Sequence, residues 1–474
     1  ILRDVMLTVQ PTEEGRFLFQ GEARGDLFDT ATIRGSVDPT TGDVDVDGKV
    51  VDLALTDNLR RRLPDELGRS FDALALGGGD VDVDLRSLAY RPGAPEETRL
   101  AYDVGVQLRR GVCSCPQLPF PLNDLSAGLS LRDGLLTIDH AEGTNGPTRV
   151  RARGAMQLGD PEHAPLTLHV ETSDLDLDDR IKAKTPPEFL ELWDVFKPKG
   201  RVDVVADVAR VVPGGPIDLA ARVDLKDVSG VYRHFPYPLK NLRGSLALKG
   251  ERLTLDLYGP VGDKEGWLRG TVDHPGPDAR VDLTVTAESL PIDDAFLDAL
   301  DPKNVRPWVD RFKPKGSVKA EAHIRRDPLV GPPPLPPEGR LIVDAFLDMD
   351  PTRCEITWEG LPFPVRNLKG RLELHPDLWI FKNLEGRNGQ AAVRGSGTVS
   401  RLPGPDLPNG DPPLAISMAL TADNLPFSSE LRNALPEAWQ KSWAFINPDG
   451  SCNVEAKIDI DTAADRDDTH VRIV

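Results

Sequence analysis

Cysteine and histidine are scarce in this chain. Its 474 residues contain four cysteines and eight histidines, too few for a disulfide framework and without the His-x-x-x-His or His–Cys spacing of a metal site. Cys113 and Cys115 form a Cys-x-Cys pair, but no second pair lies nearby to complete a metal or redox centre, and their redox state stays open. Cys452 alternates with apolar residues and is expected to be a small core residue. We therefore expect neither a metal nor a cofactor.

A net excess of positive charge and long apolar runs are lacking too. The formal net charge is −19, so the chain has no basic footprint for nucleic acid, and flat docking on an anionic membrane is also disfavoured. No apolar run approaches the roughly 18 residues of a membrane-spanning helix. Because the sequence opens on Ile1 rather than Met, we expect it to be a piece of a longer parent, with any membrane anchor in an absent segment.

Catalytic motifs are missing as well. The chain has neither a Gly-x-Ser-x-Gly nucleophile turn nor a phosphate-binding loop. Residues 43–48 (Asp-Val-Asp-Val-Asp-Gly) resemble the first half of a calcium-binding EF-hand loop, but Ala54 stands where that loop needs Glu. Val44 and Val46 fit a half-buried strand better. The sequence therefore predicts no enzymatic activity and no calcium site.

What the sequence does have is an internal repeat. A Pro-aromatic-Pro signature occurs at Leu118–Pro121, Phe235–Pro238 and Leu361–Pro364, and each copy continues with an apolar residue, two polar residues and Leu. Two prolines at alternate positions remove two N–H donors from one edge of a strand. We therefore expect each copy at a sheet edge, a bulge or a kink, where it makes a rigid beginning to the strand and the aromatic ring acts as a plug.

A second signature recurs at a similar spacing. A helical segment rich in Leu and aromatic residues is followed by Pro or Gly and then by an alternating strand, with copies ending at Gly200, Gly316 and Gly450 and a less regular copy ending at Gly79. The later copies are 116 and 134 residues apart (316 − 200 and 450 − 316). Proline-rich insertions at 331–337 and 402–413 account for the longer gap. Each helix is expected to pack on the sheet or cap its end, or alternatively to act as a hydrophobic lid.

These signatures divide the chain into four parts. The predicted boundaries are a partial repeat at 1–97, holding the end of one unit, a helix and the following strand, then repeats at 98–215, 216–331 and 332–474, the last open at its C-terminal end. Within 216–327, alternation predicts six strands and one helix that is interrupted near Asp301. The expected strands are 217–231, 239–248, 252–258, 266–272, 280–287 and 317–324, with the helix at 292–312.

The strand after each helix alternates strictly between apolar and polar residues. Strict alternation indicates a sheet with one apolar and one solvated face, as in an antiparallel meander. We expect the carboxylates of the polar face to act only as solubilising charge; they include Asp80, Asp82, Asp84, Asp203 and Asp282. Residues on the apolar face are predicted to line a groove: Val81, Val83, Leu85, Val202, Val204, Val208, Val281, Leu283, Val285, Val318, Ile324, Val454 and Ile458.

At this level of detail the chain resembles a known family. The string Leu361–Gly370, followed by a glycine-bounded hairpin and Ala392–Gly395, is similar to the C-terminal repeats of AsmA-like proteins, and Phe235–Gly244 with Leu268–Gly270 is similar to them too. With TamB and YhdP, these belong to the bridge-like lipid-transfer proteins. The resemblance covers most of the chain, although the N-terminal membrane helix typical of the family is absent from it.

The resemblance implies a fold and a function. The fold is a mainly β, elongated U-shaped (taco) sheet of tandem antiparallel β-meander repeats, with an apolar groove and one short broken helix per repeat. The function is a non-enzymatic lipid-binding groove, part of a conduit for phospholipids between membranes in a bacterial cell envelope. The expected partners are phospholipid acyl chains, and the inner and outer membranes through segments not present in this chain. The expected location is the periplasm.

Two interpretations of the apolar face stay open. Either the units merge into one continuous groove filled by lipid, or each unit folds into a closed sandwich and the chain is a structural or adhesive spacer without a ligand. The absence of a flexible linker between units favours merging. The sequence names neither the lipid nor the direction of transfer, and it leaves the oligomeric state open.

Overall fold

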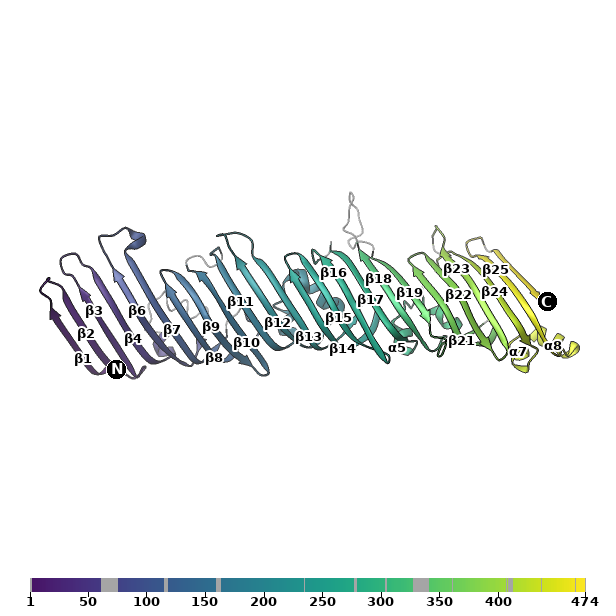
Figure 1. The fold of residues 1–474 in the computed structure, drawn as a ribbon, viewed down its shortest axis with the longest axis horizontal. Helices are drawn as coiled ribbons and strands as arrows, with labels where there is room; N and C mark the ends of the chain where they lie inside the picture. The colour runs from purple at the N-terminus through teal and green to yellow at the C-terminus, as the bar shows by residue number, and fades with distance from the viewer. Residues whose placement is uncertain are drawn as a thin grey trace. The chain divides into compact units, whose positions relative to one another are not determined.

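The computed structural model describes most of the chain, and it is mainly β (Figure 1). The described residues are 2–60, 76–114, 118–158, 163–233, 235–276, 279–302, 305–326, 341–359, 361–405, 407, 412–435, 437–464 and 466–473. Cys115, the proline-rich insertion 331–337 and part of the insertion 402–413 lie outside them. The predicted fold class is confirmed as a mainly β chain of antiparallel strands.

The chain divides into two compact units. Unit 1 holds residues 1–186, 199–226 and 247–250, and unit 2 holds 187–198, 227–246 and 251–474. Strands β13 (Asp218–Tyr232) and β14 (Phe235–Lys249) contribute residues to both. This division does not test the four repeat boundaries, which stay a prediction.

Unit 1 is an antiparallel meander in which successive long strands pair in chain order. The short β5 (Leu76–Gly77) pairs with β7. The long strands are β1 (Leu2–Pro11), β2 (Phe17–Gly25), β3 (Thr30–Val37), β4 (Val44–Ala54), β6 (Asp80–Tyr90), β7 (Leu100–Cys113), β8 (Leu122–Arg132), β9 (Leu135–Asn145), β10 (Thr148–Gln157), β11 (Leu166–Asp176) and β12 (Lys199–Arg210).

Unit 2 repeats this arrangement from β15 to β26, with the short β20 beside β21. Within the described residues β1 pairs only with β2 and β26 only with β25, so neither sheet closes on itself. The strands are β15 (Arg252–Val261), β16 (Lys264–Asp273), β17 (Arg280–Pro291), β18 (Ser317–Arg326), β19 (Ile342–Met349), β20 (Glu355–Trp358), β21 (Leu361–His375), β22 (Leu378–Asn388), β23 (Ala391–Arg401), β24 (Leu414–Pro426), β25 (Ser451–Asp461) and β26 (Arg466–Ile473).

Short helices leave the sheet at four points and return through a glycine. At each point the backbone N–H of the last strand-side residue donates to the carbonyl of that glycine: Leu55 to Gly79, Leu177 to Gly200, Ile292 to Gly316 and Phe427 to Gly450, at 2.9–3.1 Å. The next residue is a helix-capping type, whose side-chain oxygen accepts a backbone N–H: Thr56, Asp178, Asp293 and Ser428. The helices are α1 (Asp57–Arg60), α3 (Asp179–Lys182), α4 (Pro187–Phe196), α5 (Asp294–Ala299), α6 (Arg306–Phe312), α7 (Ser429–Ala434) and α8 (Glu437–Ile446); a 3-10 turn, η1 (Glu96–Thr98), lies elsewhere.

Each Pro-aromatic-Pro signature is followed by a residue with an irregular backbone conformation. The second polar residue after the prolines has a positive φ in all three copies, namely Asp124 (49°), Asn241 (51°) and Asn367 (54°). Asp and Asn tolerate this conformation better than other residues with a side chain. The register of β21 shifts next to Asn367. Before that shift, Leu361 and Val365 pair with β20, whereas the register with β22 begins only at Arg366. The proline segment therefore sits at a local edge, as the sequence predicts.

A second bulge precedes the helices. In three copies a residue with positive φ directs its N–H at a side-chain oxygen on the neighbouring strand. The donor and acceptor pairs, each at 2.9 Å, are Asp52 with Asp82, Asp174 with Asp203 and Asn424 with Asn453. The extra residue of the bulge would otherwise leave its N–H without a ladder partner. These side chains therefore hold the strand in register where it approaches the helix.

Substitution of Asp82 tests the role of the hydrogen bond between the Asp52 N–H and the Asp82 carboxyl. This carboxyl also accepts from Arg109 Nη1 at 2.6 Å, and this bond, followed by the Asp52 N–H, lowers its pKa. Replacing Asp82 by Ala should lower the free energy of unfolding by about 0.5–1.5 kcal/mol, because the Asp52 N–H loses its acceptor on an exposed part of the strand. Asp82→Asn should cost less, since an amide oxygen fills this place at Asn453. Denaturant unfolding monitored by tryptophan fluorescence measures both.

The pH dependence of the stability difference between wild type and Asp82→Asn provides the control. A carboxyl with a depressed folded pKa stabilises the fold above its unfolded pKa of about 3.9, and this stabilisation disappears as the pH falls through the folded value. The advantage of wild type over Asp82→Asn should therefore shrink below about pH 4. Equal stability of the Ala and Asn variants at pH 7 would contradict this role of Asp82.

Candidate functional site

The register of unit 2 places its predicted apolar residues on one face. Directly paired residues of antiparallel strands point to the same side of a sheet. Leu283 lies opposite both Gly270 and Ile324, Val285 lies opposite Leu268 and Ala322, and Val281 is two residues from Leu283. Past the bulge in β17, Leu290 faces Val318. The structure thus brings Val281, Leu283, Val285, Val318 and Ile324 together.

The same face continues across the rest of unit 2. Successive pairings lead from Ala322 on β18 to Ile460 on β25 through apolar residues only: Ala345, Leu374, Trp379, Val399 and Ile416. On β25, Val454 pairs with Ala422 and Ile458 with Met418. Both predicted residues therefore belong to this surface, which we call the apolar face of unit 2.

Unit 1 has a corresponding apolar face. Val81, Val83 and Leu85 lie opposite Leu108, Val106 and Val104. From Val106 the pairings run through Leu129, Ile138, Gly154 and Leu168 to Val208 on β12. Val202 and Val204 are on the same side of β12, opposite Leu175 and Thr172. The six predicted residues of unit 1 are therefore on one face.

Burial changes along each strand of these faces. The residues next to the helical segments are almost fully buried: Val81 is 6% exposed, Val202 1% and Val318 2%. The other ten predicted residues are only half-buried. Val81 belongs to a cluster that also holds the plug residue Phe120 and Ile181 of α3, and in unit 2 Leu431 of α7 clusters with the plug residue Phe363. Val318 packs with Cys354 and Leu368 from the neighbouring strands and turn. Helices therefore cover one edge of the apolar face and leave the remainder accessible.

Surface area supports the same conclusion. The chain has an accessible surface of 28681 Å² for 51.8 kDa. Two compact globules of that total mass would expose only about 21,000 Å². Among the described residues, the strands make most of their contacts with their sheet neighbours. The half-buried apolar side chains therefore remain partly accessible to solvent.

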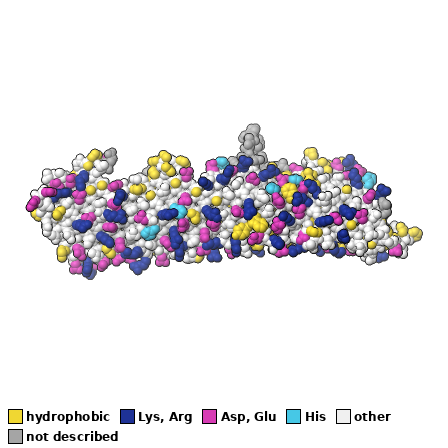
Figure 2. Space-filling view, viewed as in Figure 1, with side chains coloured by type: hydrophobic (Ala, Val, Ile, Leu, Met, Phe, Trp, Pro, Cys, Tyr) yellow, Lys and Arg dark blue, Asp and Glu magenta, His cyan; other side chains and the backbone are white. Residues whose placement is uncertain are grey.

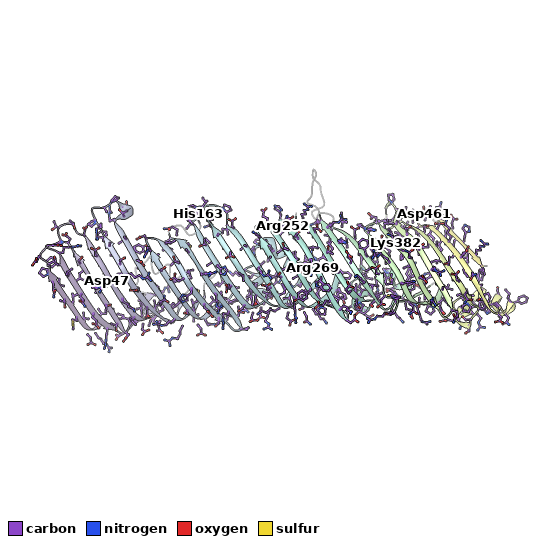
Figure 3. The ribbon with its side chains drawn as sticks, viewed as in Figure 1. Asp47, His163, Arg252, Arg269, Lys382 and Asp461 are labelled. Carbon is purple, nitrogen blue, oxygen red and sulfur yellow. The ribbon has the colours of Figure 1, made fainter. Side chains whose placement is uncertain are left out.

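The opposite face is charged, and its charges are paired across strands. Figure 2 shows Lys and Arg side chains interleaved with Asp and Glu. Arg252 pairs with Asp273 at 2.6 Å and Arg269 with Asp256 at 2.8 Å, from neighbouring strands (Figure 3). Each exposed pair contributes little by itself. Together they give the polar face a registered pattern of opposite charges.

Four of the outward carboxylates that are expected to act only as solubilising charge also form ion pairs. Asp82 pairs with Arg109 at 2.6 Å, Asp203 with Lys226 at 2.8 Å and Asp84 with Arg86 at 3.7 Å, and Asp80 pairs with Arg110. Their partners lie on other strands or around a bulge, beyond the reach of simple spacing rules. Asp282 is exposed on the same face.

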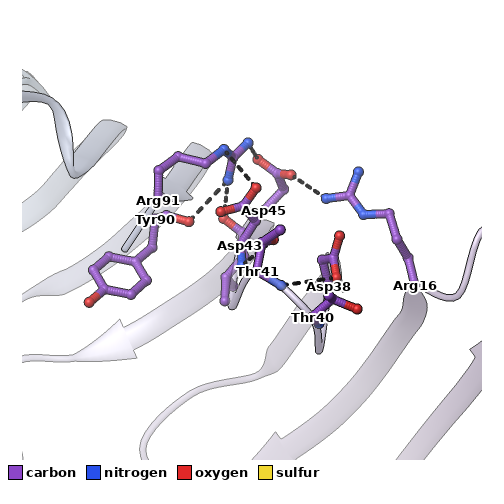
Figure 4. Close-up of polar contacts among 9 residues, drawn as sticks. Arg16, Asp38, Thr40, Thr41, Asp43, Asp45, Tyr90 and Arg91 are labelled. Atoms are coloured by element: carbon purple, nitrogen blue, oxygen red, sulfur yellow. Dashed lines mark hydrogen bonds and ion pairs between the residues drawn. The ribbon is translucent and has the colours of Figure 1, made fainter. Parts of the chain in front are cut away.

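The calcium-like string is neutralised by arginine. Asp45 Oδ1 is 2.5 Å from Arg91 Nη2 and Asp45 Oδ2 is 3.1 Å from Arg16 Nη2 (Figure 4). Hydrogen bonding from Arg91 is the chief reason that the pKa of the Asp45 carboxyl is lowered. Asp47 pairs with Arg34 at 2.5 Å. In the part of the chain that the structure describes, no group of three or more His, Cys, Asp or Glu residues could hold a metal ion.

Two of the three cysteines in the described segments are buried, and Cys452 is half-buried. Cys354 is 2% exposed and its Sγ donates to the Ser317 carbonyl at 2.9 Å. Burial raises the pKa of the Cys354 thiol, and it also raises that of Cys452, which packs beside the Phe363 cluster. Cys113 is buried too. Separately, none of the described helices has the length and hydropathy needed to cross a membrane.

Two positions on β18 test the burial gradient. Val318→Asp should lower the free energy of unfolding by on the order of 3–5 kcal/mol, because it places a charge in a covered site. Ile324→Asp, on the same face but at the uncovered end, should cost much less. Chemical denaturation of both variants measures the difference. Equally severe losses would contradict an open apolar face, since they would mean that Ile324 is covered as well.

The chain matches no family model, no curated protein and no solved structure. Its function must therefore be argued from the two faces of the sheet. One is apolar from β6 to β12 in unit 1 and from β16 to β25 in unit 2 and is only partly covered, and the other carries paired charges.

Proposed function

We propose that the chain is a non-enzymatic lipid-binding protein whose apolar faces hold the acyl chains of phospholipids. The observation that carries this proposal is the continuity of the apolar face, from β15 to β25 in unit 2, combined with its incomplete cover. A stable soluble protein normally hides a surface of this kind. Acyl chains would cover it without requiring a specific polar partner.

The dimensions of the face suit acyl chains. From Val318 to Ile324 the face extends over six residue steps, about 20 Å at 3.3 Å per residue. One leaflet of a bilayer has a hydrocarbon depth of about 15 Å, half of the 30 Å core. An acyl chain can therefore lie along a strand between the helix-covered edge and the opposite rim. Its contacts would be with Val, Ala, Leu and Ile side chains, which favours weak headgroup selectivity.

We further propose that each sheet curves around its apolar face as a U-shaped groove, with the helical segments closing one edge. The recurring hydrogen bonds at Gly79, Gly200, Gly316 and Gly450 support a regular helical closure. A closed-sandwich spacer would need a second layer over residues such as Leu283 and Ile324. Their half-buried state favours the open groove over that alternative.

The cellular setting of the proposal rests on the resemblance to AsmA-like proteins. In this proposal the chain is part of a conduit for phospholipids between the inner and outer membranes of a bacterial envelope. The groove is periplasmic, and the contacts with both membranes come from segments outside this chain. No catalytic step is involved.

A pair of substitutions on β17 tests the proposal. Solvent extraction of the purified chain, followed by mass spectrometry, should recover phospholipid. Leu283→Asp should lower the amount recovered severalfold, because it places a charge on the apolar face. Thr284→Asp, on the polar face of the same strand, is the matched control and should leave the lipid content unchanged.

Thermal unfolding of the same variants separates loss of binding from loss of fold. Leu283→Asp should unfold within a few degrees of Thr284→Asp, because Leu283 lies at the uncovered part of the face. A wild-type chain that carries no phospholipid and takes up none from vesicles would overturn the proposal. Complete unfolding of Leu283→Asp would instead favour a closed core.

A further inference from the structure

In unit 2 the C-terminal ends of two helices, α4 and α6, are each contacted by an extended segment. At α4 the Arg233 N–H donates to the Val195 carbonyl at 2.9 Å. The preceding residue, Tyr232, stacks on Phe196 with ring centroids 5.2 Å apart. Gly230 lies so close that a Cβ there would be 2.8 Å from the Phe196 carbonyl oxygen. Backbone and aromatic contacts thus combine to fix the helix end.

The contact recurs at α6. The Glu359 N–H donates to the Arg311 carbonyl at 2.7 Å, and Lys315 and Glu355 exchange two backbone hydrogen bonds of 2.9 and 3.0 Å. Val195 and Arg311 both immediately precede the string Phe-Lys-Pro-Lys-Gly that ends their helices. The residue before each N–H donor is aromatic, Tyr232 in one copy and Trp358 in the other. The two backbone contacts are therefore equivalent, whereas Phe312 and Trp358 at α6 are 41% and 47% exposed.

A third helix, α8, ends with a similar sequence, but among the described residues no extended segment packs against its C-terminal end. Phe445 occupies the position of Val195 and Arg311, before Ile446-Asn-Pro-Asp-Gly450. One side of α8 is anchored, since Trp443 meets Phe427 edge-on at 5.5 Å and packs beside the Phe363 cluster. The other side is open: Trp439 is 61% exposed, Phe445 92% and Ile446 70%. We call these three residues the α8 patch.

The sheet register shows where a cover would come from. Ile473 of β26 lies opposite Val454, as Leu347 of β19 lies opposite Ala320, the residue that corresponds to Val454. The segment that covers α6, Glu355–Glu359, follows β19 after a short turn. The corresponding place beside α8 therefore adjoins the end of β26, and no described residue fills it.

We propose that the α8 patch is the docking site of a further repeat unit joined to the sheet at β26. That unit would supply an extended segment with an aromatic side chain followed by a backbone N–H donor to the Phe445 carbonyl. Burial of three large apolar side chains drives the association, and the backbone bond aligns it. The two covered helices of unit 2 supply the geometry. The proposal is independent of lipid binding, so its test requires no lipid.

The test extends the full chain at Val474 with a second copy of residues 349–376, in phase with β19. Hydrogen exchange by mass spectrometry then compares residues 437–446 in the extended and original chains. The extension should slow exchange of these amides at least tenfold. In a matched control, the copy of Trp358 is changed to Ser and the protection should be largely lost. Unchanged exchange of α8 in the extended chain overturns the proposal, whether or not the extension is itself ordered.

Two other occupants are outcomes of a second measurement on the original chain and its Phe445→Asp variant. Light scattering should find both monomeric, and neither should float with phosphatidylcholine–phosphatidylglycerol vesicles in a way that depends on Phe445. A dimer that Phe445→Asp abolishes would assign the patch to a second copy of the chain. Vesicle binding that Phe445→Asp abolishes would assign it to a lipid surface. Either result contradicts the proposal.

Discussion

Strand register is the constraint on which the rest of this structure depends. Because side chains alternate along a strand, a slip of one residue would move apolar side chains to the solvated face. The register holds through the bulges because the extra residue is bound in place, as where the Asp52 N–H donates to Asp82. After the bulge in unit 1, Leu53 faces Val81. In unit 2 the corresponding pair is Leu425 with Cys452. Apolar residues therefore continue on one side.

The helices complete this arrangement at one edge and shape the proposed site. They leave the sheet directly after the bulge, and Ile181 of α3 packs in the cluster that buries Val81, the first apolar residue of β6. The plug residues Phe120 and Phe363 fill the space under them. Beyond that edge the predicted residues of the face, such as Leu283 and Ile324, are only half-buried. The proposed function follows from this difference between a covered edge and an open remainder.

The sequence predicted the strands and faces well because both follow from local alternation. The strand expected at 280–287 is β17 (Arg280–Pro291), and that expected at 317–324 is β18. At the proline signatures a bulge was one of three expected alternatives, and Asp or Asn before Leu was a usable signal for positive φ there. The bulges before the helices were missed. The ion pairs were missed for another reason. Asp82 and Arg109 are 27 positions apart, so only the fold brings them together, and no spacing rule could pair them. Likewise, composition could not say whether Leu283 would be covered.

Photo-crosslinking along β24 tests the central claim most directly. A photoreactive residue would be placed at successive positions from Ile416 to Thr421, and the chain would be irradiated with phospholipid bearing a labelled acyl chain. The account predicts crosslinks at 416, 418 and 420, on the apolar face, and none at 417, 419 and 421. Crosslinks of equal strength at all six positions, or none at any of them, would contradict an open apolar face that binds acyl chains.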